Sequence, residues 1–280
     1  RQMGSRVTLQ AGARMNASAS KGGANWNNNT RHAIEAGSLF RVTDAGTSVT
    51  LTNGLTGVSG TGTRFEILNE AQAQFDDFGL NYNSTDLQET WLLVSNATLS
   101  TKGFYGAGYG TSTVTIVNST IQSVGRLFLS DWWGRTRMTV DGSTWTFTGD
   151  QIQVADEMPS SYLVITNDSQ LLGTNAMLNL PGGGGHGELF ISGGSSILDL
   201  RGVWAGGWYN GPTKGTGVLT VADGALLVAR NTSVSYYPRI WSNGVMRLDG
   251  GSFSNAITLY IEQGVLEGRG AIWGNVTVNT

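Results

Sequence analysis

One short phrase recurs along the sequence, and this repetition restricts the possible folds more than any other feature of the chain. Residues 137–145 read RMTVDGSTW, residues 218–226 read VLTVADGAL, and residues 245–253 read VMRLDGGSF. In each phrase apolar side chains alternate with polar ones and are followed by a turn residue. Alternation with a period of two is typical of a β-strand with one buried side. Each unit therefore predicts a strand, a bend and a second strand.

The repeat extends over the whole chain when the turn residue is taken as an anchor. Eleven anchors have apolar side chains both four and two residues before them, in a chain that is 39% hydrophobic, and the anchors are spaced 22 to 33 residues apart. The anchors are Ala11, Asp44, Asn69, Asn96, Asn118, Gly142, Asn167, Gly193, Asp223, Gly250 and Thr280. The apolar pairs are Val7/Leu9, Phe40/Val42, Phe65/Ile67, Leu92/Val94, Val114/Ile116, Met138/Val140, Leu163/Ile165, Leu189/Ile191, Leu219/Val221, Met246/Leu248 and Val276/Val278.

A repeat of this length without helical periodicity is typical of a solenoid, because one unit is too small to bury its own apolar side chains and must stack on the next. We predict an all-β fold, a right-handed single-stranded parallel β-helix (β-solenoid) of about ten coils of 22–33 residues. It is expected to form one domain over residues 1–280, with less regular coils in 1–90 and clear repeats in 91–280. This domain is expected to be a segment of a longer or polymerising chain.

The alternative architecture is a propeller or an antiparallel sandwich. A propeller blade needs about 40 residues, which is longer than this repeat. A sandwich gives no reason for one phrase to keep one frame along the chain. The repeat therefore favours the solenoid.

The anchors are mostly Asn, Asp or Gly, which tolerate the left-handed backbone conformation of a tight bend. When coils stack at the strand spacing of about 4.8 Å, like residues lie above like. The consecutive anchors Asn69, Asn96 and Asn118 are then expected to form a ladder of side-chain amides.

The composition argues against several classes of function. The net charge is −3, with three lysines and no basic run, which argues against a nucleic-acid partner. The chain has no cysteine, which excludes disulfides and thiolate metal sites. No apolar run approaches the roughly 20 residues of a membrane-spanning helix, so this segment is not expected to insert into a membrane.

Several stretches resemble the repeat shared by type V autotransporter passengers and PEP-CTERM-associated surface proteins. The stretches are LFLSDWWGRTRMTVDGSTW (127–145), GVWAGGWYNGPTKGTGVLTVADGALL (202–227) and GVLEGRGAIWGNVTVN (264–279). The resemblance is clearest over the last two thirds of the chain, and its motifs are degenerate. It implies a large exported bacterial β-helical protein at the cell surface or in an extracellular matrix, and it implies no activity.

Two motifs invite comparison with β-helices that cleave polysaccharides. Asp76 and Asp77 are adjacent, and Gly185-His186-Gly187 follows later in the chain. An acid and a base must flank one glycosidic bond. The anchor frame places the two motifs four or five coils apart, which is about 20 Å at the strand spacing. We therefore predict no catalytic site, and a polysaccharide lyase or hydrolase remains the alternative.

Metal and cofactor sites are not predicted either. Asp156 and Glu157 would suit a calcium site, but solvated loop charges explain them more simply. Residues 181–189, PGGGGHGEL, contain a Gly-x-Gly-x-x-Gly, yet the following residues predict a strand where a dinucleotide loop needs a helix. His32 and His186 do not make a metal site by themselves.

Aromatic residues in the loops before several anchor strands are the one unusual surface feature. Stacking would bring these loops to one edge of the rod, where the rings form a ledge that binds sugars or a neighbouring subunit. Alternatively, the rings fold over the rod and cover apolar surface. The candidate ledge residues are Tyr105, Tyr109, Trp132, Trp133, Trp204, Trp208, Tyr209, Tyr236, Tyr237 and Trp241.

These observations favour a non-enzymatic structural β-helix of an extracellular bacterial fibre, matrix or surface adhesin. An open strand edge at a solenoid end invites pairing with another chain, so end-to-end or lateral self-association is expected. The alternative is a secreted polysaccharide-binding or polysaccharide-degrading β-helix, and a weaker one is a trimeric fibre like a phage tailspike. No cofactor is expected, and the expected location is extracellular or on the bacterial cell surface.

Overall fold

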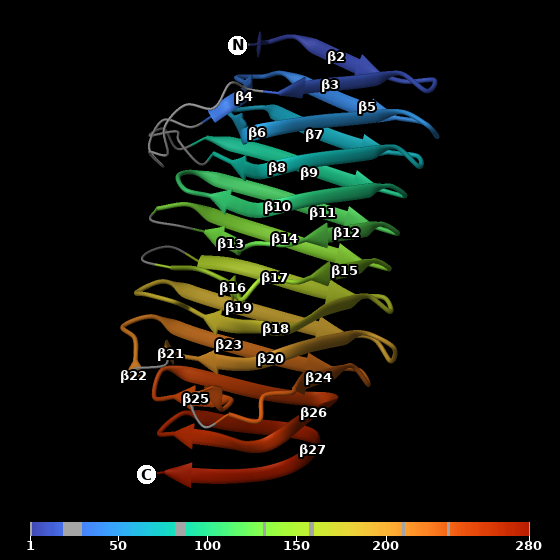
Figure 1. The fold of residues 1–280 in the computed structure, drawn as a ribbon. Helices are drawn as coiled ribbons and strands as arrows, with labels where there is room; N and C mark the ends of the chain where they lie inside the picture. The colour runs from blue at the N-terminus through green and yellow to red at the C-terminus, as the bar shows by residue number, and fades with distance from the viewer. Residues whose placement is uncertain are drawn as a thin grey trace.

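The computed structural model is a rod of stacked β-coils (Figure 1). It describes residues 2–18, 30–81, 88–130, 133–156, 160–208, 211–233 and 236–279. Strands of successive coils pair in parallel, and the coils follow one another along the rod from the N-terminus to the C-terminus. The predicted all-β parallel solenoid is confirmed, and its right-handed coiling stays a prediction.

The strands form three rows along the rod, which we name faces A, B and C. Face A carries the repeated phrase, face B follows the bend, and face C leads into the next coil. Face A contains β2 (Arg6–Leu9), β5 (Leu39–Thr43), β7 (Thr63–Leu68), β9 (Glu89–Ser95), β11 (Thr111–Val117), β14 (Arg135–Asp141), β17 (Ser160–Thr166), β19 (His186–Ser192) and β23 (Thr216–Ala222). Face B contains β3 (Arg14–Ser18), β12 (Thr120–Ser123), β15 (Thr144–Phe147) and β24 (Leu226–Ala229). Face C contains β1 (Gln2–Met3), β4 (Thr30–Glu35), β13 (Leu127–Ser130), β16 (Gln151–Gln153) and β25 (Arg239–Trp241).

Several longer strands pass from one face to the next without a break. The strands that run from face B into face C are β6 (Ser48–Ser59), β8 (Gln72–Leu80), β10 (Thr98–Ala107), β18 (Gln170–Leu180) and β20 (Ile197–Ala205). The strands that run through all three faces are β26 (Gly244–Glu262) and β27 (Val265–Asn279). A small antiparallel pair, β21 (Gly207–Trp208) and β22 (Gly211–Pro212), lies in a loop between faces C and A.

The apolar pairs of the repeated phrase lie one above the other, as the anchor frame predicts. Val114 pairs with Met138 and Met138 with Leu163, and all three side chains are fully buried. The same register connects each strand of face A to the next from Val7 to Leu248. The interior of face A is therefore a continuous apolar column.

The eleventh predicted anchor is wrong. Met246 pairs with Leu266, so β27 continues face A with the residues that follow Gly264. Val276 and Val278 lie on face C, where they pair with Leu259 and Ile261. The coil after Gly250 is shorter than the others. The alternating apolar residues of face C, Val276 and Val278, match the pattern of the repeated phrase and were therefore assigned to face A. Thr280 itself lies outside the described residues.

The bend between faces A and B has the predicted backbone conformation. Every described anchor has a positive φ, from 47° at Asn96 to 104° at Gly193. This is the left-handed region, which Asn, Asp and Gly occupy at low cost. The turn chemistry of the phrase therefore sets where each coil leaves face A.

The amide ladder predicted at this bend is not formed. The backbone N–H of Asn118 donates to the carbonyl oxygen of Asp141 at 2.9 Å, and no side-chain hydrogen bond joins Asn69, Asn96 and Asn118 within the described residues. The ladder instead uses buried serine hydroxyls just after the anchor. The N–H of Ser119 donates to Ser143 Oγ at 3.0 Å, and the N–H of Ser143 donates to Ser169 Oγ at 3.1 Å. The space inside the bend is small, so the short hydroxyl of serine fits there better than an amide. The asparagine anchors point their side-chain amides outward.

The first half of the core is aromatic. Phe40 and Phe65 stack with ring centroids 5.1 Å apart, Phe65 meets Phe78 edge-on at 5.6 Å, and Phe104 lies 6.0 Å from Trp145. Beyond these rings the buried core consists mainly of Leu, Ile, Val and Ala, with Met246 and Phe253 near the C-terminal end. The apolar core thus runs along the axis of the rod, and small residues such as Ser119 and Ser143 occupy the bend between faces A and B.

Candidate functional site

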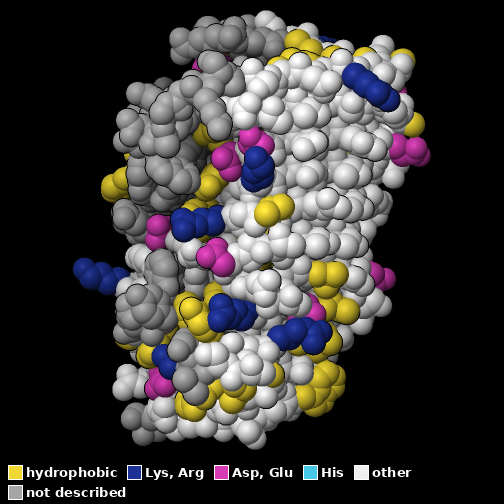
Figure 2. Space-filling view, in the orientation of Figure 1, with side chains coloured by type: hydrophobic (Ala, Val, Ile, Leu, Met, Phe, Trp, Pro, Cys, Tyr) yellow, Lys and Arg dark blue, Asp and Glu magenta, His cyan; other side chains and the backbone are white. Residues whose placement is uncertain are grey.

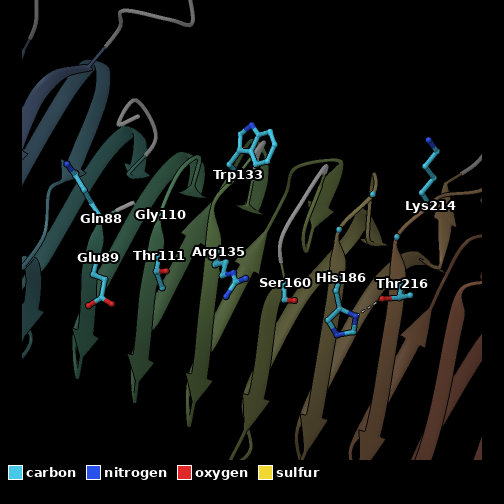
Figure 3. A pocket seen from close by; sticks show the side chains of 13 residues that line it. Gln88, Glu89, Gly110, Thr111, Trp133, Arg135, Ser160, His186, Lys214 and Thr216 are labelled. Carbon is cyan, nitrogen blue, oxygen red and sulfur yellow. Dashed lines mark hydrogen bonds between the residues drawn. The ribbon is translucent and has the colours of Figure 1, made fainter. Parts of the chain in front are cut away.

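An open groove of about 830 Å³ runs along the corner between faces C and A (Figure 3). Its length follows the axis of the rod, across the starts of six face A strands. Six of the lining side chains come from these strand starts, in sequence order Glu89, Thr111, Arg135, Ser160, His186 and Thr216. Each is the first residue of its strand, from β9 to β23. We call these six residues the axial row.

The anchor frame explains why the axial row is straight. Each member lies seven residues before its anchor, so consecutive members are in register, as Thr111 is with Arg135 and His186 with Thr216. Five steps at the strand spacing of about 4.8 Å make the row roughly 24 Å long. At the same position in the first three coils the sequence has Gly4, Gly37 and Gly62, which offer no side chain.

Glycines next to the axial row keep the groove open. A Cβ at Gly134 would overlap the carbonyl oxygen of Ala107, and one at Gly215 would overlap that of Gly185. A Cβ at Gly110, which has a φ of 69°, would overlap the backbone of Gln88. The backbones therefore approach too closely for side chains at these positions, and a hollow remains beside the row.

Hydrogen bonds fix the C-terminal part of the row. His186 Nδ1 and Thr216 Oγ1 are 2.6 Å apart, and His186 Nε2 lies 3.6 Å from Glu188 Oε2. The ring of Tyr162 meets the His186 ring edge-on with centroids 6.2 Å apart. The imidazole is thus held by polar contacts on two sides.

The other charged groups of the groove are exposed. Arg135 and Lys214 extend into solvent, and within the described residues neither forms an ion pair or a hydrogen bond through its side chain. Trp133 borders the groove with 55% of its surface exposed. Figure 3 shows its indole standing beside the row, on the same side as Lys214.

The two motifs considered for catalysis lie on separate coils. Asp76 and Asp77 are on β8, whereas His186 is on β19, with β10, β13, β16 and β18 pairing in sequence between them on face C. Burial, and then the charge of Asp76, raises the pKa of Asp77. Burial opposes ionisation of Asp76 too, but Lys102 Nζ at 2.8 Å and the N–H of Asn53 at 2.7 Å lower its pKa. The acidic pair is therefore a local cluster away from the groove.

The predicted aromatic ledge is spread over face C and its corners. Tyr105 and Trp204 are buried, with exposed fractions of 6% and 3%. Half-buried residues of this set are Tyr109, Tyr236, Tyr237 and Trp241. Trp132 and Tyr209 lie outside the described residues, as does the side chain of Trp208.

Trp133 is the ledge residue that borders the groove. Near the C-terminal end, Trp204 Nε1 donates to the carbonyl oxygen of Tyr237 at 2.9 Å, and Arg201 lies over the ring of Tyr236 at 3.6 Å. Packing of this kind covers the rod locally and depends on the loop of each coil.

The axial row was missed in the sequence, although a signal was present. Numbering each coil from its anchor aligns the apolar residues four and two positions before the anchor. The same numbering also aligns the residues seven positions before it. There, three glycines are followed by six residues that carry polar or charged side chains. The hollow beside the row could not be predicted from the sequence, because it depends on where the loops lie in three dimensions.

Comparisons with known proteins find no relative. No family model, no curated protein and no solved structure matches the chain. The described residues contain no helix that is long and apolar enough to cross a bilayer, and no group of three or more His, Asp or Glu side chains that would hold a metal ion. The resemblance to autotransporter passengers and PEP-CTERM-associated proteins stays a prediction.

Proposed function

We propose that the chain is a non-enzymatic, rigid β-helix of an extracellular bacterial fibre, matrix or surface adhesin. The observation that supports this role best is the unbroken register of face A from Val7 to Leu248. A continuous core and cross-coil hydrogen bonds make every coil support its neighbours, which suits a protein that spans a distance. Ten steps at the strand spacing give a rod about 50 Å long.

Ion pairs between adjacent coils add to this stiffness. Arg41 contacts Glu66 at 2.6 Å, and Arg230 holds Asp199 with two hydrogen bonds of 2.6 and 2.7 Å. Lys102–Asp76 and Arg247–Glu267 make similar contacts. Figure 2 shows that charged side chains are otherwise sparse on the face in view, where uncharged polar side chains and backbone dominate.

End-to-end assembly follows from the similarity of the coils. Each coil presents nearly the same strand edge to the next, so the same pairing would continue across a junction between two copies. Electron micrographs of the native material test this proposal. Fibres or rods about 20 Å or more across, built at the strand spacing, are expected; single particles that stay monomeric at high concentration would contradict assembly.

The axial groove favours a second candidate role, which is polysaccharide binding. A linear hollow lined by hydroxyl, amide and charged side chains suits an extended polymer. Among the described lining residues Glu89 alone carries a carboxylate, and hydrolysis of a glycosidic bond uses two carboxyl groups. The groove therefore supports binding over hydrolysis, and a reducing-sugar assay with plant and algal polymers would detect cleavage by either a hydrolase or a lyase.

A further inference from the structure

The cations of the axial groove differ from the ion-paired cations of the rod. Arg135 and Lys214 are exposed and have no side-chain partner within the described residues, although Arg41, Lys102 and Arg230 are paired across coils. Arg135 and Lys214 also line the same groove, unlike the exposed Arg14 of face B. Both cations are therefore available to an anionic ligand that lies in the groove.

The spacing of the two cations points to a polymer. Arg135 starts β14, and Lys214 lies just before β23. The starts of β17 and β19, at Ser160 and His186, lie between them in register. Three strand steps correspond to about 14 Å, which is too far for one small anion to bridge. A chain with regularly placed negative charges can contact both cations at once.

The remaining groups along the groove match a carbohydrate. Thr111, Ser160 and Thr216 place hydroxyls in the same row as the charges, with Ser160 between the two cations, and these hydroxyls can exchange hydrogen bonds with the hydroxyls of sugar rings. Trp133 offers an exposed indole face beside them, and aromatic rings of this kind mark contact sites.

We propose that the axial groove binds a linear polysaccharide that carries carboxylates, laid along the axis of the rod. Arg135 and Lys214 contact carboxylates, the hydroxyl groups of the row contact sugar hydroxyls, and Trp133 stacks on a ring face. This site goes beyond the structural role, because it does not depend on whether copies assemble. The groove offers two cations three strand steps apart, which is too few for the closely spaced phosphates of a nucleic acid, so a nucleic acid is the poorer ligand.

Calorimetric titration of the chain with polygalacturonate tests the proposal, and the fully methyl-esterified polymer serves as the matched ligand without charges. We expect the acidic polymer to bind roughly tenfold more tightly than the ester, with binding weakened by salt. Alginate, a second polyuronate, is expected to bind as well, whereas the single sugar galacturonic acid is not. Equal binding of acid and ester, failure of both polyuronates to bind, or tighter binding of single-stranded DNA would overturn the proposal.

Variants locate the ligand on the groove. The double variant Arg135→Gln/Lys214→Gln is expected to lose about tenfold in affinity, since exposed charge contacts are individually weak. Trp133→Ala is expected to lose about threefold to tenfold. Arg14→Gln, an exposed arginine on β3 of face B, is the matched control and is expected to bind like the parent. A loss in Arg14→Gln equal to that of the double variant would place the binding elsewhere.

Discussion

The two corners that flank face A are built in different ways. At the corner with face B each coil turns at one or two residues with positive φ, and in most coils a small buried residue follows. At the corner with face C the connections vary in length, and glycines allow backbones to touch. Figure 1 shows the regular bends on one side of the rod and the variable loops on the other. The regular corner sets the register, and the variable corner holds the groove, so structure and binding are assigned to separate edges.

The largest effect is expected from a side chain at the variable corner. A Cβ at Gly217 would overlap the carbonyl oxygen of Leu180, which is backbone and cannot move aside. Gly217→Ala should lower the free energy of unfolding by about 3 kcal/mol, the upper range for overpacking. Gly194→Ala is the control, because nothing lies within 4 Å of its Cβ. Urea denaturation of both variants measures the difference, and equal stabilities would contradict a steric requirement for glycine at position 217.

A smaller loss is expected from the hydroxyl ladder of the regular corner. Ser143 Oγ accepts from the N–H of Ser119 and donates to the carbonyl oxygen of Asp141 at 2.7 Å. Ser143→Ala leaves a buried N–H unpaired and should cost about 1–3 kcal/mol in urea denaturation. Ser195→Ala, which changes an exposed serine, should cost less than about 0.5 kcal/mol. Were Ser143→Ala as harmless as its control, the ladder would not contribute to stability.

A still smaller change in stability is expected when the side chain of an anchor is replaced. Asn118 has φ of 48°, so Asn118→Ala forces a residue with Cβ into the left-handed region at a cost of about 1 kcal/mol. Asn118→Gly should be nearly neutral, because glycine adopts this conformation freely. Melting temperatures of the two variants separate a backbone requirement from a side-chain one. A loss in the glycine variant as large as in the alanine variant would indicate that the amide itself matters.

The acidic pair on β8 should give the smallest signal, as a pH dependence. The lowered pKa of Asp76 means that its stabilising contribution is present above the ordinary value of 3.8 and is lost as the pH falls through the folded-state pKa. The pKa of Asp77 is raised, so its charged form destabilises the fold, and protonation removes this penalty as the pH falls toward 3.8. Asp77→Asn should therefore stabilise the chain at pH 7 and give no gain below pH 3.8. Urea titrations at several pH values check this, and a gain that persists at low pH would contradict the raised pKa.

The sequence was sufficient for the parts of the fold that repeat. Alternating apolar residues and a turn residue placed Met138 and Leu163 in adjacent layers and predicted the positive φ at Asn167, because each signal lies within a few residues. The same reasoning failed at Val276, where alternation occurs on face C as well. Alternating apolar residues are enough to identify a strand. Assigning that strand to a face and to a register also requires the anchor residue that follows it.

The site was less accessible from sequence for a physical reason. The axial row lies on the repeating frame, and residues such as Arg135 and His186 could have been found there. The burial of Tyr105 and Trp204, by contrast, depends on the path of loops whose lengths differ from coil to coil. Loop paths are set by contacts between coils. The position of the aromatic residues before the anchor strands therefore suggested a ledge without showing which rings reach solvent.

Distances along face A test the central claim most directly, and the lack of cysteine in the chain makes them easy to measure. Spin labels on engineered cysteines at Thr43 and, in turn, at Asp141, Thr166 and Ser192 sit on outward positions of one column. Stacked coils predict distances of about 19, 24 and 29 Å, because each added coil contributes one strand spacing of about 4.8 Å. Distances from electron–electron double resonance that fail to increase by this step from coil to coil would contradict the solenoid.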